Sequence, residues 1–198
     1  MGRPPGIANG DILAVARRVL LARGAGVSVA EIARELGVSH TTLFNRFGSK
    51  EALMIAALGA LDGVTWAEDL ENGPDQRPIV EQLLGHGRIV SAHLQQLHEG
   101  LAVLQAAGIS PQLVCADQSV DSGPVKAFKA LVRWLDRAQQ QGRLAKCDTE
   151  ALASTILGAL YNSTVTSAVC GQPTGKHDRE RYVDNFIHIL WRGIDPQL

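Results

Sequence analysis

The sequence predicts an all-α protein with a small N-terminal three-helix head, residues 1–55, and a larger helical body, residues 56–198, about nine helices in total. Apolar residues recur at the three- and four-residue spacing of helices along most of the chain. Serine and glycine stand at the ends of these stretches, where they favour helix caps. The 198 residues are 45% hydrophobic and 20% charged, an ordinary globular composition that can bury a sizeable core.

The first helix of the head follows one apolar stripe and stops at a glycine. The stripe consists of Ile12, Val15, Ala16, Val19 and Leu20. These positions lie at i, i+3, i+4, i+7 and i+8, which places them on one helix face. Gly24 stands where a left-handed C-terminal cap belongs, so the helix is expected to end there.

The second helix begins at a capping box. Ser28 is followed three residues later by Glu31, so the hydroxyl can accept from a first-turn amide while the carboxylate reaches back to the amide of Ser28. Gly37 supplies the positive φ that stops the helix abruptly, and Ser39 caps a new helix two residues later. A short helix, a three-residue turn with glycine and a second helix have the spacing of a helix-turn-helix.

The third helix, from Ser39 to about Phe47, has few apolar residues. Leu43 and Phe47 can anchor one side on the first two helices, which leaves polar side chains to point outward. These are His40, Thr41, Asn45 and Arg46. Small polar groups on a rigid helix suit hydrogen bonds to base edges in the major groove, and arginine suits a phosphate or a guanine. The alternative interpretation is a solvated helix face.

A fourth helix begins after Ser49, which is its expected N-cap. Lys50 and Glu51 occupy its first turn. Backbone amides at a helix N-terminus together with a lysine form a natural phosphate clamp. The start of this helix is therefore a second candidate contact with an anionic partner.

The residues from Val29 to Leu53 carry a family resemblance. The matching elements are Ile32-Ala33, Gly37-Val38-Ser39, Thr42-Leu43-Phe44, Phe47 and the run Ser49-Lys50-Glu51-Ala52-Leu53. With these spacings the segment resembles the DNA-binding signature of the TetR family of bacterial transcriptional regulators. The resemblance in residues covers about the first 60 positions, and over the remainder it is architectural, a larger helical body of low similarity.

The resemblance implies which side chains face DNA. His40, Thr41 and Asn45 would face bases, and Arg46 would lie near the backbone. Family members usually have a tyrosine at the position of Phe44, and Phe44 can pack but cannot make the phosphate bond of that hydroxyl. Thr42, Lys50 and Ser28 would face phosphates. The complete predicted DNA-binding set is Ser28, Ser39, His40, Thr41, Thr42, Phe44, Asn45, Arg46 and Lys50.

The charge is distributed unevenly along the chain. The net charge of −1 argues, taken alone, against a nucleic-acid binder. Residues 1–55, however, hold seven Lys or Arg and four Asp or Glu, a net +3, whereas residues 56–198 carry −4. A basic head on an acidic body points to an anionic partner at one end. Arg3 lies in a non-helical Pro-rich arm that would either enter a minor groove or remain a disordered terminus.

The body is expected to be helical throughout. The fourth helix should continue through Leu61 and fade near residues 71–74, which read as a linker. A long helical stretch follows from about residue 77 to 107, in which Gly85, Gly87 and Gly100 suggest a bend or break. Further helices are predicted at 112–116, 125–142, 151–169 and 178–191.

A family-like body would hold an inducer cavity. The candidate pocket residues are Trp66, His86, His93, Leu97, Leu104, Cys115 and Trp134. Leucine walls with a few polar groups indicate a small, mostly apolar effector with one or two hydrogen-bonding groups. The alternative is that these residues simply fill a core. The histidines lack a carboxylate or cysteine at helical spacing, so no metal is predicted.

The helices at 125–142 and 151–169 are the predicted dimer interface. Small residues on the second of them allow another helix to approach closely, and the resemblance makes this pair a four-helix bundle between two subunits. The predicted interface residues are Phe128, Val132, Leu135, Ile156, Ala159, Leu160 and Ser163. Packing within one chain is the alternative. Reading a palindrome requires two copies, since each copy contacts one half-site.

The sequence favours a regulator over an enzyme. It contains no GxSxG elbow, phosphate-binding glycine loop or HExxH, and its three cysteines form no CxxC pair. No cofactor, signal peptide or membrane span is expected, which predicts a cytoplasmic protein. We expect a homodimeric, ligand-responsive repressor of a double-stranded DNA operator. The first alternative is a helical small-molecule-binding protein with a vestigial head, and a weaker one is an enzyme that uses the body cavity.

Overall fold

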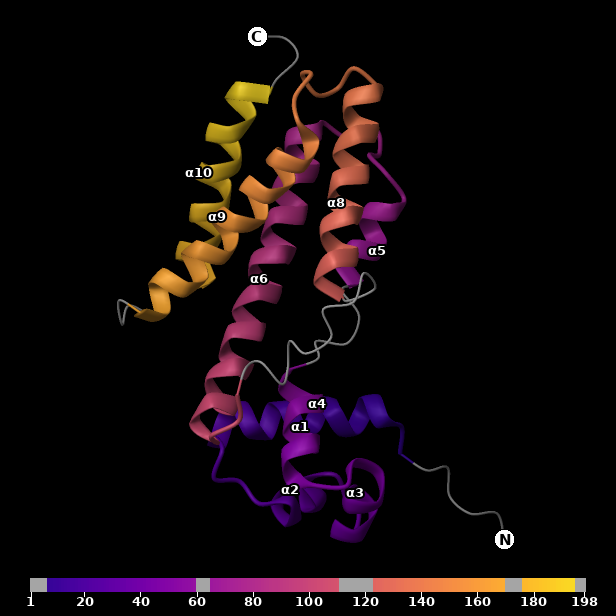
Figure 1. Ribbon diagram of the computed structural model, residues 1–198, viewed down its shortest axis with the longest axis vertical. Helices are drawn as coiled ribbons and strands as arrows, with labels where there is room; N and C mark the ends of the chain where they lie inside the picture. The colour runs from indigo at the N-terminus through magenta and orange to yellow at the C-terminus, as the bar shows by residue number, and fades with distance from the viewer. Residues whose placement is uncertain (1–6, 60–64, 111–122, 170–175, 195–198) are drawn as a thin grey trace, which may run out of the picture. The chain divides into compact units, whose positions relative to one another are not determined.

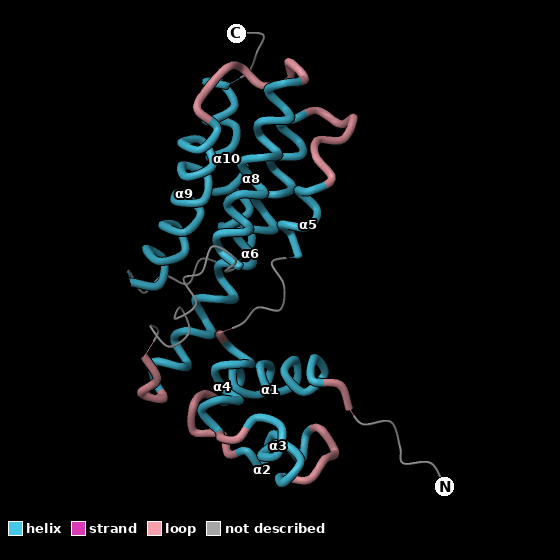
Figure 2. Tube along the Cα trace, turned by 45° about the vertical axis from the view of Figure 1, so that its right-hand side comes forward, coloured by secondary structure: helices cyan, strands magenta, loops and turns pink. Residues whose placement is uncertain are grey.

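A computed structural model describes residues 7–59, 65–110, 123–169 and 176–194 of the chain. Helices and their connecting loops account for all of these residues, and the described part contains no strand (Figures 1 and 2). This confirms the predicted all-α class. Arg3, Cys115 and the predicted helix at 112–116 lie outside the described residues.

Five shorter helices and one long helix lie in the first half of the chain. They are α1 (Asn9–Arg23), α2 (Val29–Glu35), α3 (His40–Phe47), α4 (Lys50–Leu58), α5 (Thr65–Glu71) and, as the long helix, α6 (Ile79–Ala106). The second half contains α8 (Gly123–Gln140), α9 (Thr149–Val169) and α10 (Lys176–Ile194). These residues form two compact units, one of residues 1–63 and 96–118 and the other of residues 64–95 and 119–198.

The first unit is the helical head together with the C-terminal end of α6. Its helix ends follow the local signals of the sequence, because the hydroxyls of Ser28, Ser39 and Ser49 each accept a hydrogen bond from an amide of the following helix. Gly37 and Gly48 have positive φ angles of 66° and 77°, where a side chain would be strained. The core of this unit contains Ile12, Ala16, Leu20, Ile32, Leu43, Leu53, Leu58, Leu104 and Ile109.

The fourth helix differs from the prediction, because α4 ends at Leu58 and α5 is a separate helix. Gly59 is the C-cap of α4, and its amide donates to the carbonyl of Ile55 at 2.8 Å. The guanidinium of Arg17 binds the next carbonyls of α4, those of Ala57 at 3.2 Å and Leu58 at 3.5 Å. These bonds satisfy groups that a helix end leaves without intrahelical partners.

The long helix α6 is continuous through the glycines that suggested a break. A Cβ atom on Gly87 would lie 2.9 Å from the side chain of Val183, and one on Gly100 would lie 2.6 Å from the carbonyl oxygen of Leu58. Both glycines therefore allow a neighbour to approach α6 closely, Val183 in the second unit and α4 in the first. Gly87 and Gly100 are therefore packing positions. A Cβ on Gly85 would meet nothing within 4 Å, and α6 continues through this glycine as well.

The second unit packs α5, the first half of α6, α8, α9 and α10 around one core. Trp134, Leu135, Leu160, Val183 and Ile187 are among its most buried side chains. Helix α5 packs on α8, and α8 packs on α9. The helices α9 and α10 run side by side in both views (Figures 1 and 2), and the hydroxyl of Tyr182 donates to the carbonyl of Ala159 at 3.3 Å.

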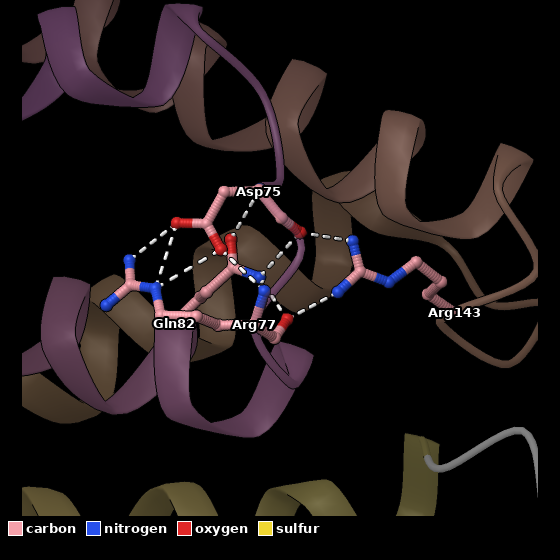
Figure 3. Close-up of polar contacts among 4 residues, drawn as sticks. All are labelled: Asp75, Arg77, Gln82 and Arg143. Carbon is pink, nitrogen blue, oxygen red and sulfur yellow. Dashed lines mark hydrogen bonds and ion pairs between the residues drawn. The ribbon is translucent and has the colours of Figure 1, made fainter.

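Polar contacts fix the turn before α6 to the turn after α8 (Figure 3). Arg143 donates from its two terminal nitrogens to the carbonyls of Asp75 and Arg77, at 2.6 and 2.5 Å. The buried amide of Gln82 accepts from the Asp75 amide at 2.9 Å and donates to the same two carbonyls. Hydrogen bonds from Arg77 lower the pKa of the Asp75 carboxyl.

Candidate nucleic-acid interface

The helix-turn-helix is built by α2 and α3, which pack together in the first unit (Figure 1). The turn between them is closed by two backbone hydrogen bonds, from the Gly37 amide to the Arg34 carbonyl at 3.2 Å and from the Val38 amide to the Ala33 carbonyl at 3.0 Å. Leu43 is the buried anchor of α3. The third helix is therefore held rigidly from beneath, as a helix that reads a groove must be.

The outer face of α3 presents four side chains to solvent. His40, Thr41, Phe44 and Asn45 are all exposed, and Phe44 keeps 38% of its surface accessible. The rings of His40 and Phe44, one turn apart, lie with their centroids 4.5 Å apart and tilted by 51°. This face offers an apolar ring for a thymine methyl and hydroxyl, amide and imidazole groups for base edges.

Ser39 and Thr42 form the polar start of the same helix. The Ser39 hydroxyl accepts from the Thr42 amide at 3.1 Å and lies 2.8 Å from the Thr42 hydroxyl. Ser39 is exposed and Thr42 half-buried. The pair stabilises the helix start, where backbone amides and the positive end of the helix dipole favour a phosphate.

Arg46 lies against the segment that precedes α1. Its guanidinium donates to the carbonyl of Ile7 and to the side-chain oxygen of Asn9, the latter at 3.1 Å. The arginine thereby ties the last turn of α3 to the start of the first helix. In this conformation Arg46 fixes the N-terminal segment within the head. Its position in the sequence does not indicate this partner.

Lys50 binds the loop between α1 and α2. Its ammonium donates to the carbonyl of Ala25 at 2.8 Å, and the side chain is half-buried. It still stands in the first turn of α4, directly after the exposed N-cap Ser49. To contact a phosphate, the ammonium would have to release the Ala25 carbonyl or use its two other N–H donors.

Ser28 forms both halves of the predicted capping box. Its hydroxyl accepts from the Glu31 amide at 3.2 Å and donates to the Glu31 carboxylate at 2.7 Å, and its own amide donates to the same carboxylate at 2.9 Å. These bonds lower the pKa of Glu31. Both donors of Ser28 are thus directed to Glu31, so a phosphate at this position would compete with a carboxylate.

Arg17 is a contact residue of the head that sequence reasoning missed. It donates to the carbonyls of Ala57 and Leu58 and, at 2.6 Å, to that of Gln96 in α6. Partial burial lowers the pKa of its guanidinium from the ordinary value, and the carboxylate of Glu99 opposes this shift. In the sequence Arg17 is marked only by its place beside the apolar stripe of α1. A solvated arginine would have the same place.

Two family models match the sequence over the two parts of the chain. Bacterial regulatory proteins of the tetR family match residues 12–57, the segment that contains the helix-turn-helix. The C-terminal domain of AefR-like transcriptional repressors matches residues 101–192. The chain belongs to the TetR family of bacterial regulatory proteins. Proteins of this family are DNA-binding regulators and not enzymes.

Solved structures of TetR-family regulators have the same fold. One from Mesorhizobium loti is 20% identical with a TM-score of 0.70 and covers 94% of this chain and 96% of that one. One from Pectobacterium atrosepticum is 23% identical with a TM-score of 0.64, covering 94% and 93%. The ketosteroid regulator KstR2 of Mycobacterium tuberculosis is 19% identical with a TM-score of 0.57, covering 98% and 99%. No curated protein matches the sequence.

The predicted pocket residues of this TetR-family chain are divided between the two units. Trp66, His86, His93 and Trp134 belong to the second unit, where both tryptophans are buried. Leu97 and Leu104 belong to the first unit, and Leu104 is fully buried in the core of the head. The described residues contain no group of three or more side chains able to hold a metal ion.

The predicted interface residues mostly face the core of their own chain. Leu135, Ile156 and Leu160 are buried, and Phe128, Val132, Ala159 and Ser163 are half-buried. The reason is that α8 and α9 pack on each other within the second unit. The large apolar side chains that remain exposed on this pair and α10 are Tyr161, Tyr182 and Ile189. Among the side chains that the structure describes, the large exposed apolar ones of these three helices therefore lie on α9 and α10.

Proposed function

We propose that this TetR-family protein is a ligand-responsive transcriptional repressor that binds a palindromic operator as a homodimer and is released by a small, mostly apolar effector. The observation that carries the proposal is the outer face of α3, where four side chains able to contact bases are exposed on a helix anchored by Leu43. Such a protein works on the chromosome, so we place it in the cytoplasm.

The DNA-binding part is tested by fluorescence anisotropy with labelled DNA that flanks the protein's own gene. We expect a sequence-specific complex whose affinity falls steeply with salt. Asn45→Ala should lower the affinity for the specific site by about 1–3 kcal/mol and relax the sequence preference. Asn72→Ala is the matched control, because Asn72 is exposed directly after α5 in the second unit, outside α3, α9 and α10. Equal effects of the two variants would contradict the assignment of the α3 face.

We place the homodimer contact on α9 and α10. Ala151, Ser154, Gly158 and Tyr161 follow one another at helical spacing along α9 and are all exposed, and small residues permit close helix approach. Ile189 keeps 73% of its surface accessible on α10. A dimer that buries this surface removes exposed apolar area from water.

Sedimentation equilibrium tests this contact with a pair of isoleucines. Ile189→Glu should convert the dimer into a monomer, because it places a charge in an apolar interface. Ile89→Glu is the control, since Ile89 is also exposed, at 47%, but lies on α6. A dimer that persists in Ile189→Glu and dissociates in Ile89→Glu would move the interface away from α10.

The effector part is tested by dissociation of the operator complex. We propose that effector binding in the second unit changes the separation of the two recognition helices, so that two half-sites about 34–36 Å apart are no longer matched. A footprint that stays unchanged with every candidate effector would contradict release by a ligand.

Two observations favour a second candidate, a helical small-molecule-binding protein with a vestigial head. Arg46 and Lys50 both donate to groups within the head, and Phe44 has no hydroxyl for a phosphate. Absence of any salt-sensitive, sequence-specific complex in the anisotropy experiment would favour this candidate over the repressor.

A further inference from the structure

Two histidine–tryptophan pairs lie along α6 in the second unit. His86 packs edge-on against Trp134 of α8, with ring centroids 5.3 Å apart at 77°. His93 packs in the same way against Trp66 of α5, at 6.4 Å and 73°. Seven residues make two helical turns, so the histidines share one face of α6 about 10.5 Å apart. Trp134 is 0% and Trp66 5% exposed.

Three nitrogen atoms of these pairs are buried without a hydrogen-bond partner. They are Nε1 of Trp66, Nε1 of Trp134 and Nδ1 of His86. Buried polar groups in native proteins are nearly always bonded, and an unbonded donor lowers the stability of the packing around it. Within the described residues, this part of the core holds hydrogen-bonding capacity that the chain itself does not use.

Gln82, one turn before His86 on α6, shows the contrast. Its amide oxygen accepts from the Asp75 amide at 2.9 Å, and its nitrogen donates to the carbonyls of Asp75 and Arg77 at 3.1 and 2.6 Å (Figure 3). The side-chain amide of Gln82, at the start of this helix face, thus has hydrogen-bond partners for its oxygen and its nitrogen. The unbonded atoms begin one turn further along.

The unused groups are uncharged. An indole N–H can only donate, and burial lowers the pKa of His86, so its imidazole is neutral at pH 7. The buried polar residues of the described chain are Gln82, Ser91, Thr149 and Thr164, none of which carries a charge. The charges that act on His86 are those of Asp69, Asp75 and Arg77, two carboxylates and one guanidinium. A carboxylate buried here would lose its hydration and meet more negative than positive charge, whereas an uncharged oxygen would gain the donors at much lower cost.

We propose that Trp66, His86 and Trp134 recognise the effector, and that the effector is an uncharged, largely apolar molecule with carbonyl or ether oxygens that accept hydrogen bonds. This inference rests on the proposed effector function of the second unit. Because the three nitrogens are covered in this structure, a ligand reaches them only when the surrounding side chains move apart. The ligand therefore stabilises a packing different from the free one, which couples its binding to a conformational change.

Three matched probes test the chemical class by isothermal titration calorimetry on the full-length protein without DNA. They are 4-phenyl-2-butanone, 3-phenylpropanoate and butylbenzene, which share the phenylethyl group and differ in a ketone, a carboxylate and a hydrocarbon end. Two neutral hydrogen bonds predict that the ketone binds about tenfold tighter than the hydrocarbon. The carboxylate should bind more weakly than the ketone by at least the same factor. Equal or tighter binding of the carboxylate, or binding of none of the three, would overturn the proposal.

The ratio of ketone to butylbenzene affinity identifies the donors. Trp134→Phe and Trp66→Phe should each reduce this ratio about threefold or more, because they remove an N–H that only the ketone uses. Trp191→Phe is the control, since Trp191 packs half-buried on the same core from α10. A merely structural role would weaken both probes equally and leave the ratio unchanged. If Trp134→Phe does not fold, the affinity ratios of Trp66→Phe and His86→Phe test the same assignment.

Operator binding, measured separately without probe, distinguishes two kinds of failure. A protein that binds its operator but does not discriminate the probes contradicts only the effector class. A protein that prefers the ketone through Trp66 and Trp134 but binds no specific DNA contradicts the regulator and leaves this site in place.

Discussion

Replacement of Arg17 by methionine should destabilise the protein, because one guanidinium holds three carbonyls of the first unit. It donates to Gln96 at 2.6 Å and, more weakly, to Ala57 and Leu58 at 3.2 and 3.5 Å. Methionine keeps much of the apolar stem and removes the charged donors. A hydrogen bond from a charged group contributes about 1.5–3 kcal/mol. Since the site is only partly buried and the bonds to α4 are long, we expect about 2 kcal/mol in total.

Urea unfolding and thermal melting at one fixed protein concentration measure this loss. For a chain of this size, about 2 kcal/mol corresponds to a melting temperature roughly 4–8 °C lower. Arg18→Met is the matched control, because the neighbouring arginine is exposed and makes one long ion pair, 3.9 Å from Glu35. Such a pair contributes less than about 1 kcal/mol. Equal stabilities of the two variants would refute the structural role of Arg17.

Three further predictions concern single side chains. Gly100→Ala should lower the free energy of unfolding in urea by about 1–3 kcal/mol, because its Cβ would lie 2.6 Å from the Leu58 carbonyl oxygen. Gly85→Ala on the same helix is the control, since its Cβ meets nothing within 4 Å, and it should be neutral or stabilising. The difference in unfolding free energy between the protein and Glu31→Gln should be complete above the ordinary glutamate pKa, about 4.3. It should disappear as the pH falls through the lowered pKa of Glu31 in the folded protein. A difference that does not change with pH would contradict the capping box. Lys50→Ala should weaken operator binding for all sequences and reduce the salt slope by about one, and an unchanged slope would leave Lys50 as a structural contact.

The ends of the helices in the head could be predicted from the sequence because they depend on neighbours within a few residues. Ser28 and Glu31 form the expected capping box. Gly24 ends α1 as expected and has a positive φ of 78°, but its ψ of −174° is extended and not that of a left-handed cap. The all-α class followed for the same reason, since helical periodicity is local. The DNA-binding face was expected from the spacing around Leu43, and the exposure of α3 agrees with it without testing any single base contact.

Features that depend on distant parts of the chain could not be predicted. Gly87 and Gly100 suggested breaks in the helix, because the close approach of Val183 and Leu58 leaves no mark at the glycines themselves. An apolar stripe likewise does not reveal whether it covers its own chain or a second copy. Leu160, expected at the interface, is for this reason found in the core of the second unit.

The division of α6 between the two units has a practical consequence for protein engineering. Residues 79–95 belong to the second unit and residues 96–106 to the first, and Leu104 and Ile109 complete the core around α1 to α4. An isolated head cut before residue 64 would expose the side chains that these two residues cover. A chimaera that joins this head to another effector domain should therefore also take residues 96–109 from this protein, as a second inserted segment.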